Sequence, residues 1–213
     1  MSTKWIDITQ PFNNQIAHWP GDTPFSYEIS YTKAKTGSVN IGKITTSLHT
    51  GTHVDSPFHF DDHGEQIHEL DVDIFIGRAL VIDVSSLEHI GPQQLEAYRL
   101  GGAERLLLRT TTRSEPTLFP GKVTPLDLAL GPFLKKKGIF LLGVDVPSVD
   151  TLDSKNMEVH HSLHKNNIHI LENIILDHVE SGLYEMIALP LLIEGADGSP
   201  VRAVIRPIEE RRM

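Results

Sequence analysis

The chain has 213 residues, no cysteine and a formal net charge of −9. The length suits one domain spanning residues 1–213, and the negative charge argues against nucleic acid or an anionic membrane as a partner. The lack of cysteine excludes disulfides, thiolate metal sites and thiol nucleophiles. No secretory signal and no apolar run of membrane-span length is present, so we expect a cytoplasmic protein.

Alternating polar and apolar residues predict strands in the first fifty residues. A short strand is expected over residues 5–9, and two more over residues 25–31 and 39–48. The loop HWPGDTPF separates the first two strands and presents Trp19, which either covers part of the core or lines a pocket. The third strand leads directly into a segment rich in histidine.

That segment, HTGTHVDSPFHF, runs from His49 to Phe60. Its β-branched residues, glycine and proline disfavour a helix, so we expect a tight loop at a strand end, with Gly51 allowing the turn. His49, His53 and Asp55 would then converge as a three-ligand set that leaves a coordination position open, which is typical of a catalytic metal site. Imidazole with carboxylate suits zinc, manganese or iron. The competing interpretation is a polar surface loop with structural histidines.

The middle of the chain alternates apolar strands with helices. Buried strands are expected over residues 78–84, 104–110 and 138–145. Helices are expected over residues 91–100 and 125–137, the second with Thr124 as N-cap and lysines at its C-terminal end. This order predicts an α/β element flanked by β-rich segments. Asp145 and Asp150, near the end of the last strand, are either turn residues or part of a pocket.

Glu172 is a single acidic residue inside the strand-like run IHILENIIL. Burying an unpaired carboxylate costs several kcal/mol, so Glu172 is either a metal ligand or an edge residue that faces solvent. His160 and His161 begin a helical turn before this strand, and only one of them can easily share an orientation with Glu172. The other histidines of the chain are interpreted as structural or exposed: His63, His68, His164 and His169.

The histidine-rich segment resembles the signature HxGTHxDxPxHF of the metal-dependent cyclase-like hydrolase family. It matches every fixed position of that signature. Within this family the chain is most similar to the bacterial arylformamidases, and the similarity extends from Trp5 to Pro207. The resemblance implies an α/β (β/β/α) fold with a swivelling, barrel-like mixed sheet and flanking helices, and it implies a homodimer.

Five candidate ligands exceed what one tetrahedral zinc needs, so two divalent ions bridged by Asp55 are expected. The resemblance implies that His49, His53 and Asp55 hold one ion, and that Asp55, His160 and Glu172 hold the other. The family spacing, with a histidine twelve residues before the glutamate, favours His160 over His161. Zinc is the first choice of metal, and manganese is the alternative.

The resemblance assigns the matching histidine, His59, as general acid and base, which suits the ordinary pKa of imidazole. A spare metal ligand is its competing role. The resemblance also assigns Trp19 to the substrate pocket, where an indole face suits an aromatic substrate. Further aromatic residues could line this cleft: Phe25, Phe58, Phe60 and Phe119.

The implied activity is hydrolysis of a small aromatic formamide, N-formyl-L-kynurenine, to L-kynurenine and formate in tryptophan degradation. Opening of a cyclic amide such as isatin is the alternative enzyme activity, and a non-enzymatic metal-binding protein is the alternative of another class. A serine hydrolase is disfavoured because the G-x-S-x-G and HGGG motifs are absent from the sequence. A cupin-like oxygenase is disfavoured because its H-x-H pair with a nearby glutamate is absent.

Overall fold

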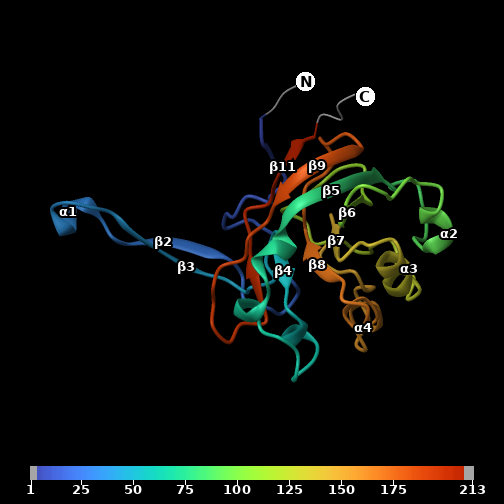
Figure 1. Cartoon of the computed structure of the whole chain (residues 1–213). Coiled ribbons are helices and arrows are strands. Elements are labelled where there is room, and N and C mark those ends of the chain that lie inside the picture. Colours follow the sequence, from blue (N-terminus) through green and yellow to red (C-terminus); the bar gives the residue numbers. More distant parts are fainter. Residues whose placement is uncertain (1–3, 209–213) are drawn as a thin grey trace.

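The computed structural model describes residues 4–208, and its centre is a curled sheet of nine strands (Figure 1). The strand order is β1-β11-β9-β5-β6-β7-β8-β4-β10. The bounds are β1 (Ile6–Asp7), β4 (His53–Asp55), β5 (Ile76–Asp83), β6 (Arg105–Arg109), β7 (Leu141–Val144), β8 (His169–Glu172), β9 (Gly182–Ile187), β10 (Gly198–Pro200) and β11 (Val204–Pro207). This sheet confirms the predicted α/β fold with a barrel-like mixed sheet.

The helices are short; α2, α3 and α4 lie between the parallel strands, whereas α1 lies between the two strands of a separate hairpin. They are α1 (Lys33–Thr36), α2 (Pro92–Leu95), α3 (Leu130–Lys136) and α4 (Glu158–Lys165), with 3-10 turns η1 (Pro57–His59), η2 (Ile67–Glu69) and η3 (Val72–Phe75). Strands β5, β6, β7 and β8 are mutually parallel, and their connections contain α2, α3 and α4 in turn. The predicted strand–helix–strand passages are therefore confirmed. Among the described residues, no helix is both long and apolar enough to cross a membrane.

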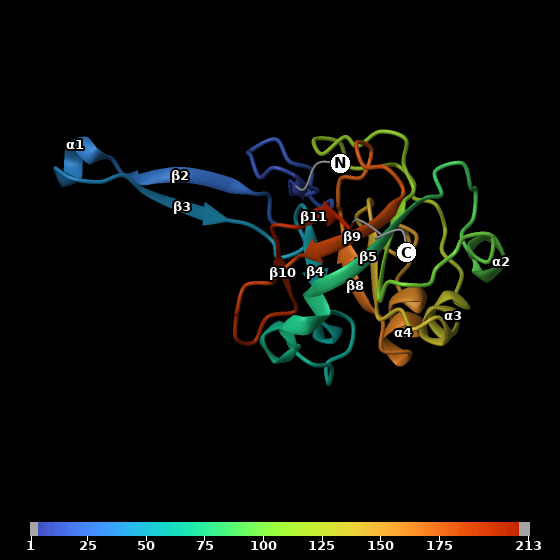
Figure 2. The same ribbon diagram turned by 45° about the horizontal axis from the view of Figure 1, so that its top comes forward.

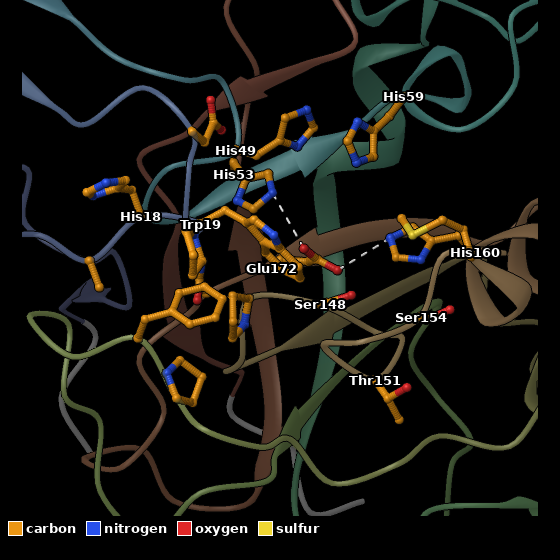
Figure 3. Close-up of a pocket in the computed structure, with 18 of the residues that line it drawn as sticks. His18, Trp19, His49, His53, His59, Ser148, Thr151, Ser154, His160 and Glu172 are labelled. Atoms are coloured by element: carbon orange, nitrogen blue, oxygen red, sulfur yellow. Dashed lines mark ion pairs between the residues drawn. The ribbon is translucent and has the colours of Figure 1, made fainter.

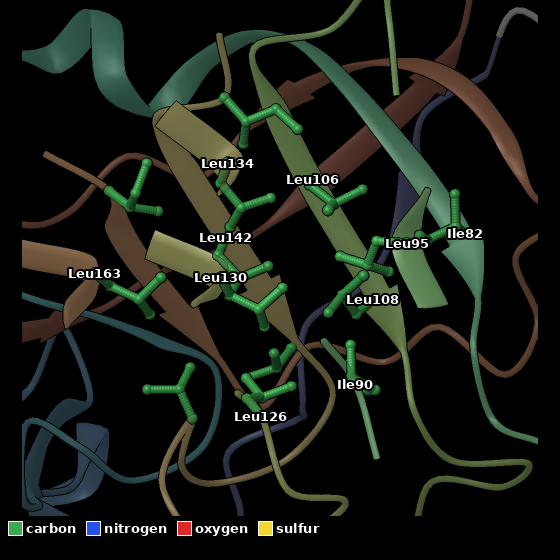
Figure 4. Close-up of a cluster of buried hydrophobic side chains, with 14 of the residues drawn as sticks. Ile82, Ile90, Leu95, Leu106, Leu108, Leu126, Leu130, Leu134, Leu142 and Leu163 are labelled. Carbon is green, nitrogen blue, oxygen red and sulfur yellow. The ribbon is translucent and has the colours of Figure 1, made fainter. Parts of the chain in front are cut away.

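Apolar side chains on the two faces of the sheet form two separate cores. On the face covered by α2, α3 and α4, Leu106 and Leu108 of β6 pack with Leu134 of α3 (Figure 4). The intervening Leu107 points to the opposite face, where it joins Leu171 of β8 in the second core. Each fully buried leucine stabilises the fold by about 1.5–3 kcal/mol relative to exposure, so the parallel strands form a firm support for the loops at their ends.

Two predicted helices are shorter in the structure. The predicted helix over residues 125–137 begins only at Leu130, and Thr124 is not its N-cap. Leu126 instead forms a parallel bridge with Ile90 and is buried, which holds this part of the chain in an extended conformation. The predicted helix over residues 91–100 is reduced to Pro92–Leu95. The lysines at the C-terminal end of the longer helix are confirmed, since Lys135 and Lys136 lie in the last turn of α3.

A separate two-stranded sheet projects far from the body of the protein. It consists of β2 (Ser26–Tyr31) and β3 (Ile41–Thr45), joined through α1, and it stands apart in both ribbon views (Figures 1 and 2). The alternation predicted both strands, although β3 ends at Thr45, three residues before the expected end. The chain leaving β3 runs back to the body and reaches His49.

Candidate functional site

Two paired strands near one edge of the sheet carry three of the predicted ligands. His53 and Asp55 are two residues apart on β4, so both side chains point to the same face. Glu172 on β8 is the register partner of His53 across the antiparallel pair and shares that face. The expectation of a loop is therefore corrected for His53 and Asp55, which lie on a short strand. Gly51, just before it, adopts the positive φ of 67° that the predicted turn requires.

The remaining two predicted ligands reach the same point from a turn and from a helix. His49 lies in the turn before β4, and its Nδ1 is 3.0 Å from Oδ1 of Asp55. His160 lies in the first half of α4, and its Nε2 is 3.5 Å from Oδ2 of Asp55 and 3.7 Å from Oε1 of Glu172. Figure 3 shows Glu172 between the imidazoles of His53 and His160. All five side chains thus converge, with Asp55 in contact with the other groups.

Two carboxylates are buried at this point, and a bound cation would offset the free-energy cost of burying their charges. The exposed fractions of Asp55 and Glu172 are only 4% and 3%. Burial and the neighbouring charge of Asp55 raise the pKa of Glu172 well above its usual range. Burial also acts to raise the pKa of Asp55, but the close imidazoles of His160, His49 and His53 outweigh it and lower that pKa. Two carboxylates this close in a dry site require positive charge between them.

Hydrogen bonds to carboxylates favour the protonated form of two imidazoles in the cluster. Burial alone would lower the pKa of His49, yet its hydrogen bonds to Asp197 and Asp55 raise it to about 10. The same opposition operates at His160, where the hydrogen bond to Asp150 leads the raising effects and the pKa again reaches about 10. A metal ion would replace these protons, because imidazole binds metals in its neutral form.

The imidazoles are oriented so that one ring nitrogen of each faces the cluster. His53 donates from Nδ1 to the carbonyl oxygen of Gly51 at 2.8 Å, which directs Nε2 toward the carboxylates. His160 donates from Nδ1 to Oδ2 of Asp150 at 2.6 Å. Asp150 is fixed in turn by backbone N–H groups at the start of α4. Such outer partners hold metal-binding histidines in the required tautomer.

The donor set fits divalent metal ions. Nε2 of His53 and Oδ2 of Asp55 are buried and have no hydrogen-bond partner, which is costly for polar atoms without a ligand. Among the described residues, three groups of donor atoms lie within 4.8 Å of one another. One is His49–His59–Asp197, and the predicted ligands form the other two, His49–His53–Asp55 and Asp55–His160–Glu172. Asp55 belongs to both groups, as a bridging carboxylate would. The five predicted ligands therefore lie together in this geometry.

His59 lies beside this cluster and is held by an acidic residue that the sequence interpretation missed. It ends η1, its ring is 3.9 Å from that of His49, and its side chain is 29% exposed to solvent. Oδ2 of Asp197 contacts both histidines, at 3.0 Å from Nε2 of His49 and 3.5 Å from Nδ1 of His59. Hydrogen bonds from His49 and His59 hold the pKa of Asp197 far below its usual range. Asp197 remains a charged anchor for both imidazoles.

A cleft of about 760 Å³ opens onto the cluster and has an aromatic wall. Trp19 lines it and contacts Phe119 edge to face, with ring centroids 5.2 Å apart. Phe60 also lines the cleft, whereas Phe58 and Phe25 do not, and Phe25 stacks on Phe12 instead. The cluster lies at the base of a space large enough for a substrate with one aromatic ring.

The other histidines stand outside the two donor groups. His161 lines the cleft and contacts the ring of Phe60, but its side chain is not part of either group. His164 also contacts Phe60, and burial together with the charge of His164 lowers the pKa of His169 to about 4. Of the two neighbouring histidines at the start of α4, the structure therefore brings His160 to the cluster.

Asp197 and the strained residues of the cleft gave no recognisable signal in the sequence. Asp197 is placed by the pairing of β10 with β4, in which the adjacent Gly198 faces Asp55. Met157 and Asn173 both line the cleft and have positive φ values of 49° and 57°. Such strain in a non-glycine residue costs about 1–3 kcal/mol and is common at functional sites. No local sequence spacing reveals any of these three.

Comparisons with known proteins agree with this geometry. A model of the family described as "Putative cyclase" matches residues 6–151. The chain is 59% identical over 207 residues to kynurenine formamidase from Bacillus thuringiensis (strain Al Hakam), covering 97% of this chain and 99% of that protein. It is 58% identical over the same length to kynurenine formamidase from Bacillus anthracis, with the same coverage.

Solved structures with a similar fold are more distant in sequence. Isatin hydrolase A from Labrenzia aggregata superposes with a TM-score of 0.81 at 21% identity, covering 97% of this chain and 94% of that one. A potential metal-dependent hydrolase with cyclase activity gives a TM-score of 0.82 at 21% identity, covering 97% of this chain and 99% of that one. These likenesses establish the fold.

Proposed function

The chain belongs to the putative cyclase family, and from this premise we propose that it hydrolyses N-formyl-L-kynurenine to L-kynurenine and formate. The observation that carries the proposal is the convergence of His49, His53, Asp55, His160 and Glu172 below an aromatic cleft. High identity to kynurenine formamidases over nearly the whole chain supports the choice of substrate.

A divalent metal fits the cluster, and we propose two ions, zinc or alternatively manganese. His49, His53 and Asp55 would hold one ion, and Asp55, His160 and Glu172 would hold the other. When bound, such ions lower the pKa of a water molecule and polarise a carbonyl oxygen. Asp150 and Asp197 contribute indirectly, because they orient His160 and His49.

His59 is proposed to move the proton that hydrolysis requires. Water adds its oxygen to the formyl carbon, the bond from that carbon to the aryl nitrogen breaks, and the nitrogen leaves with a proton. His59 stands beside the cluster at the cleft, where it can accept a proton from the water and return it to the leaving amine. Because Asp197 lies on the Nδ1 side of His59, that contact leaves Nε2 for the exchange.

Trp19 and Phe119 are proposed to hold the aromatic ring of the substrate. Their edge-to-face contact presents a rigid apolar wall to one side of the cleft. A flat bicyclic amide such as isatin also meets this requirement, and isatin hydrolase A shares the fold. The substrate must therefore be decided by direct competition.

We also propose that the chain forms a homodimer.

The test is turnover of N-formyl-L-kynurenine and of isatin by the purified protein, with and without added zinc after chelation. We expect kcat/KM for formylkynurenine to exceed that for isatin, and both activities to depend on metal. His59→Asn should retain metal and lose most turnover. Preference for isatin would replace the substrate assignment, and metal binding without turnover of either compound would favour a non-enzymatic metal-binding protein.

A further inference from the structure

The cleft above the cluster has two chemically different sides. One side is the aromatic wall of Trp19 and Phe119. The other side is formed from residues 147–157, here called the polar segment, which lie between β7 and α4. In Figure 3, Trp19 lies to one side of Glu172, and on the other side are three hydroxyl-bearing residues of the polar segment: Ser148, Thr151 and Ser154. A substrate with an aromatic ring and a polar end would therefore lie in one orientation, with its ring on the wall and its polar end toward the polar segment.

Lys155 gives the polar segment a positive charge. It is the one lysine or arginine among the described residues that line the cleft. It is exposed, and it forms no ion pair with any residue in the range 4–208. Asp22 and Glu115 also line the cleft, and the whole chain carries a formal net charge of −9. An unpaired ammonium group in such acidic surroundings is available to pair with an anionic group of a ligand.

Hydroxyl donors lie next to this lysine. The hydroxyl of Ser154 has no hydrogen-bond partner within the described part of the chain, whereas the backbone N–H of Ser154 closes a turn by donating to the carbonyl of Thr151 at 2.9 Å. Oγ of Ser148 accepts a hydrogen bond from the N–H of Asp150 at 3.1 Å, which leaves its own proton to donate. Each oxygen of a carboxylate accepts more than one hydrogen bond, so an ammonium group with neighbouring hydroxyls suits a carboxylate.

The polar segment is fixed to the cluster at both of its ends. Near its start, the N–H of Val149 donates to Oε1 of Glu172 at 2.9 Å. Asp150 accepts hydrogen bonds from the backbone N–H of His160 at 3.1 Å and from Nδ1 of the same residue at 2.6 Å. The groups that position two candidate metal ligands therefore also position Lys155. A molecule whose amide carbonyl lies at the cluster would meet this lysine at a defined distance.

The polar segment ends in a strained residue that faces the cleft. Met157 is the N-cap of α4 and has a left-handed backbone, with φ 49° and ψ 44°, and no side-chain capping bond. It lines the cleft directly after the cleft-lining residues 154–156. A non-glycine residue in this conformation is unfavourable and is found mainly where function requires the local geometry. The sharp turn at Met157 therefore points to a requirement on where residues 154–156 lie.

We propose that Lys155, assisted by the hydroxyl of Ser154, binds the α-carboxylate of an aryl formamide that carries an amino-acid side chain. The formamide would lie at the cluster and the aromatic ring against Trp19. This inference rests on the proposed hydrolysis of N-formyl-L-kynurenine and deepens it, because it assigns a site to the amino-acid end of that substrate. Isatin has no carboxylate, so Lys155 would favour formylkynurenine over isatin.

The test removes the carboxylate charge and the lysine separately and together. Steady-state kinetics are measured for N-formyl-L-kynurenine and for its methyl ester, with the wild type and with Lys155→Ala, at saturating zinc. Loss of a charged hydrogen-bond partner at a partly exposed site should raise KM for the acid by about 10-fold and change kcat little, because the contact is the same in the bound substrate and in the transition state. The ester should be affected far less, so the preference for the acid over the ester should fall by about 10-fold.

A binding measurement and two further variants complete the test. Calorimetry should show that Lys155→Ala binds the product L-kynurenine about 10-fold more weakly, with a much smaller effect on its methyl ester. Lys155→Arg should retain most of the preference for the acid. The matched control is Lys165→Ala, at an exposed lysine in the last turn of α4 that does not line the cleft, and it should retain the wild-type KM for both compounds. Metal content and circular dichroism check that each variant is intact.

The outcomes separate this inference from the proposed function. If Lys155→Ala kept the wild-type preference for the acid over the ester, or if the wild type had no such preference, the assignment of Lys155 would be overturned and the formamidase activity would stand. A wild type that hydrolysed neither compound would overturn the proposed function and the carboxylate site together.

Discussion

Asp197→Asn tests whether one carboxylate orients both His49 and His59. The substitution keeps the shape of the side chain and removes the charge that holds Nε2 of His49 at 3.0 Å and Nδ1 of His59 at 3.5 Å. A hydrogen bond to a charged group contributes about 1.5–3 kcal/mol, and the 39% exposure of the Asp197 side chain places it at the lower end of that range. We therefore expect kcat to fall by about 10-fold and metal affinity to fall by a similar factor.

The assay separates these two effects. Steady-state kinetics with N-formyl-L-kynurenine at saturating metal reports on His59, and competition with a chelator reports on His49. Asp62→Asn is the matched control, since Asp62 is an exposed residue close to His59 in the chain. If Asp197→Asn retained the wild-type kcat and metal affinity, Asp197 would have no orienting role and the account of His59 would need another partner.

Three other outcomes follow from the structure. Gly64→Ala would place a Cβ 2.4 Å from the backbone carbon of Pro57. We therefore expect the free energy of unfolding in urea to fall by about 1–3 kcal/mol, and kcat to fall because η1 shifts. The control Gly121→Ala, whose Cβ would have nothing within 4 Å, should change neither quantity. Burial lowers the pKa of His169 to about 4, so as the pH falls this histidine takes up a proton in the unfolded chain before it does so in the folded chain. The free energy of unfolding therefore falls as the pH drops from 6.5 toward 4. Between pH 7 and pH 5, the free energy of unfolding of the wild type should fall by about 2 kcal/mol more than that of His169→Gln, as measured by urea titration. If the variant showed the same pH dependence as the wild type, this assignment would be contradicted. Removal of metal by a chelator should lower the melting temperature, because it leaves two buried carboxylates without a cation, and zinc should restore it; an unchanged melting temperature would argue against metal at this site.

The sequence predicted the parts of the site that depend on local patterns. His49, His53 and Asp55 lie within seven residues, and the strand that bears Glu172 makes a lone acid conspicuous. The structure adds that β4 and β8 pair in a register that places Glu172 opposite His53. That register was not predictable from either segment alone, because it depends on how the whole sheet assembles.

The parts that escaped prediction depend on long-range pairing. Asp197 reaches His49 only because β10 pairs with β4, and the two residues are 148 positions apart. The segment before α3 has a helix-like composition, but its bridge to Ile90 holds it extended. The alternation in β2 and β3 predicted strands but not their separation from the main sheet, since period-two patterns do not specify which sheet a strand joins.

The central claim is that the chain holds a pair of divalent ions bridged by Asp55. The measurement that tests it most directly is metal content per chain, determined together with kcat for N-formyl-L-kynurenine, in the wild type and in Glu172→Ala. We predict about two ions per chain in the wild type, and about one ion with no measurable turnover in the variant. A Glu172→Ala protein that kept its full metal content and its turnover would contradict the claim.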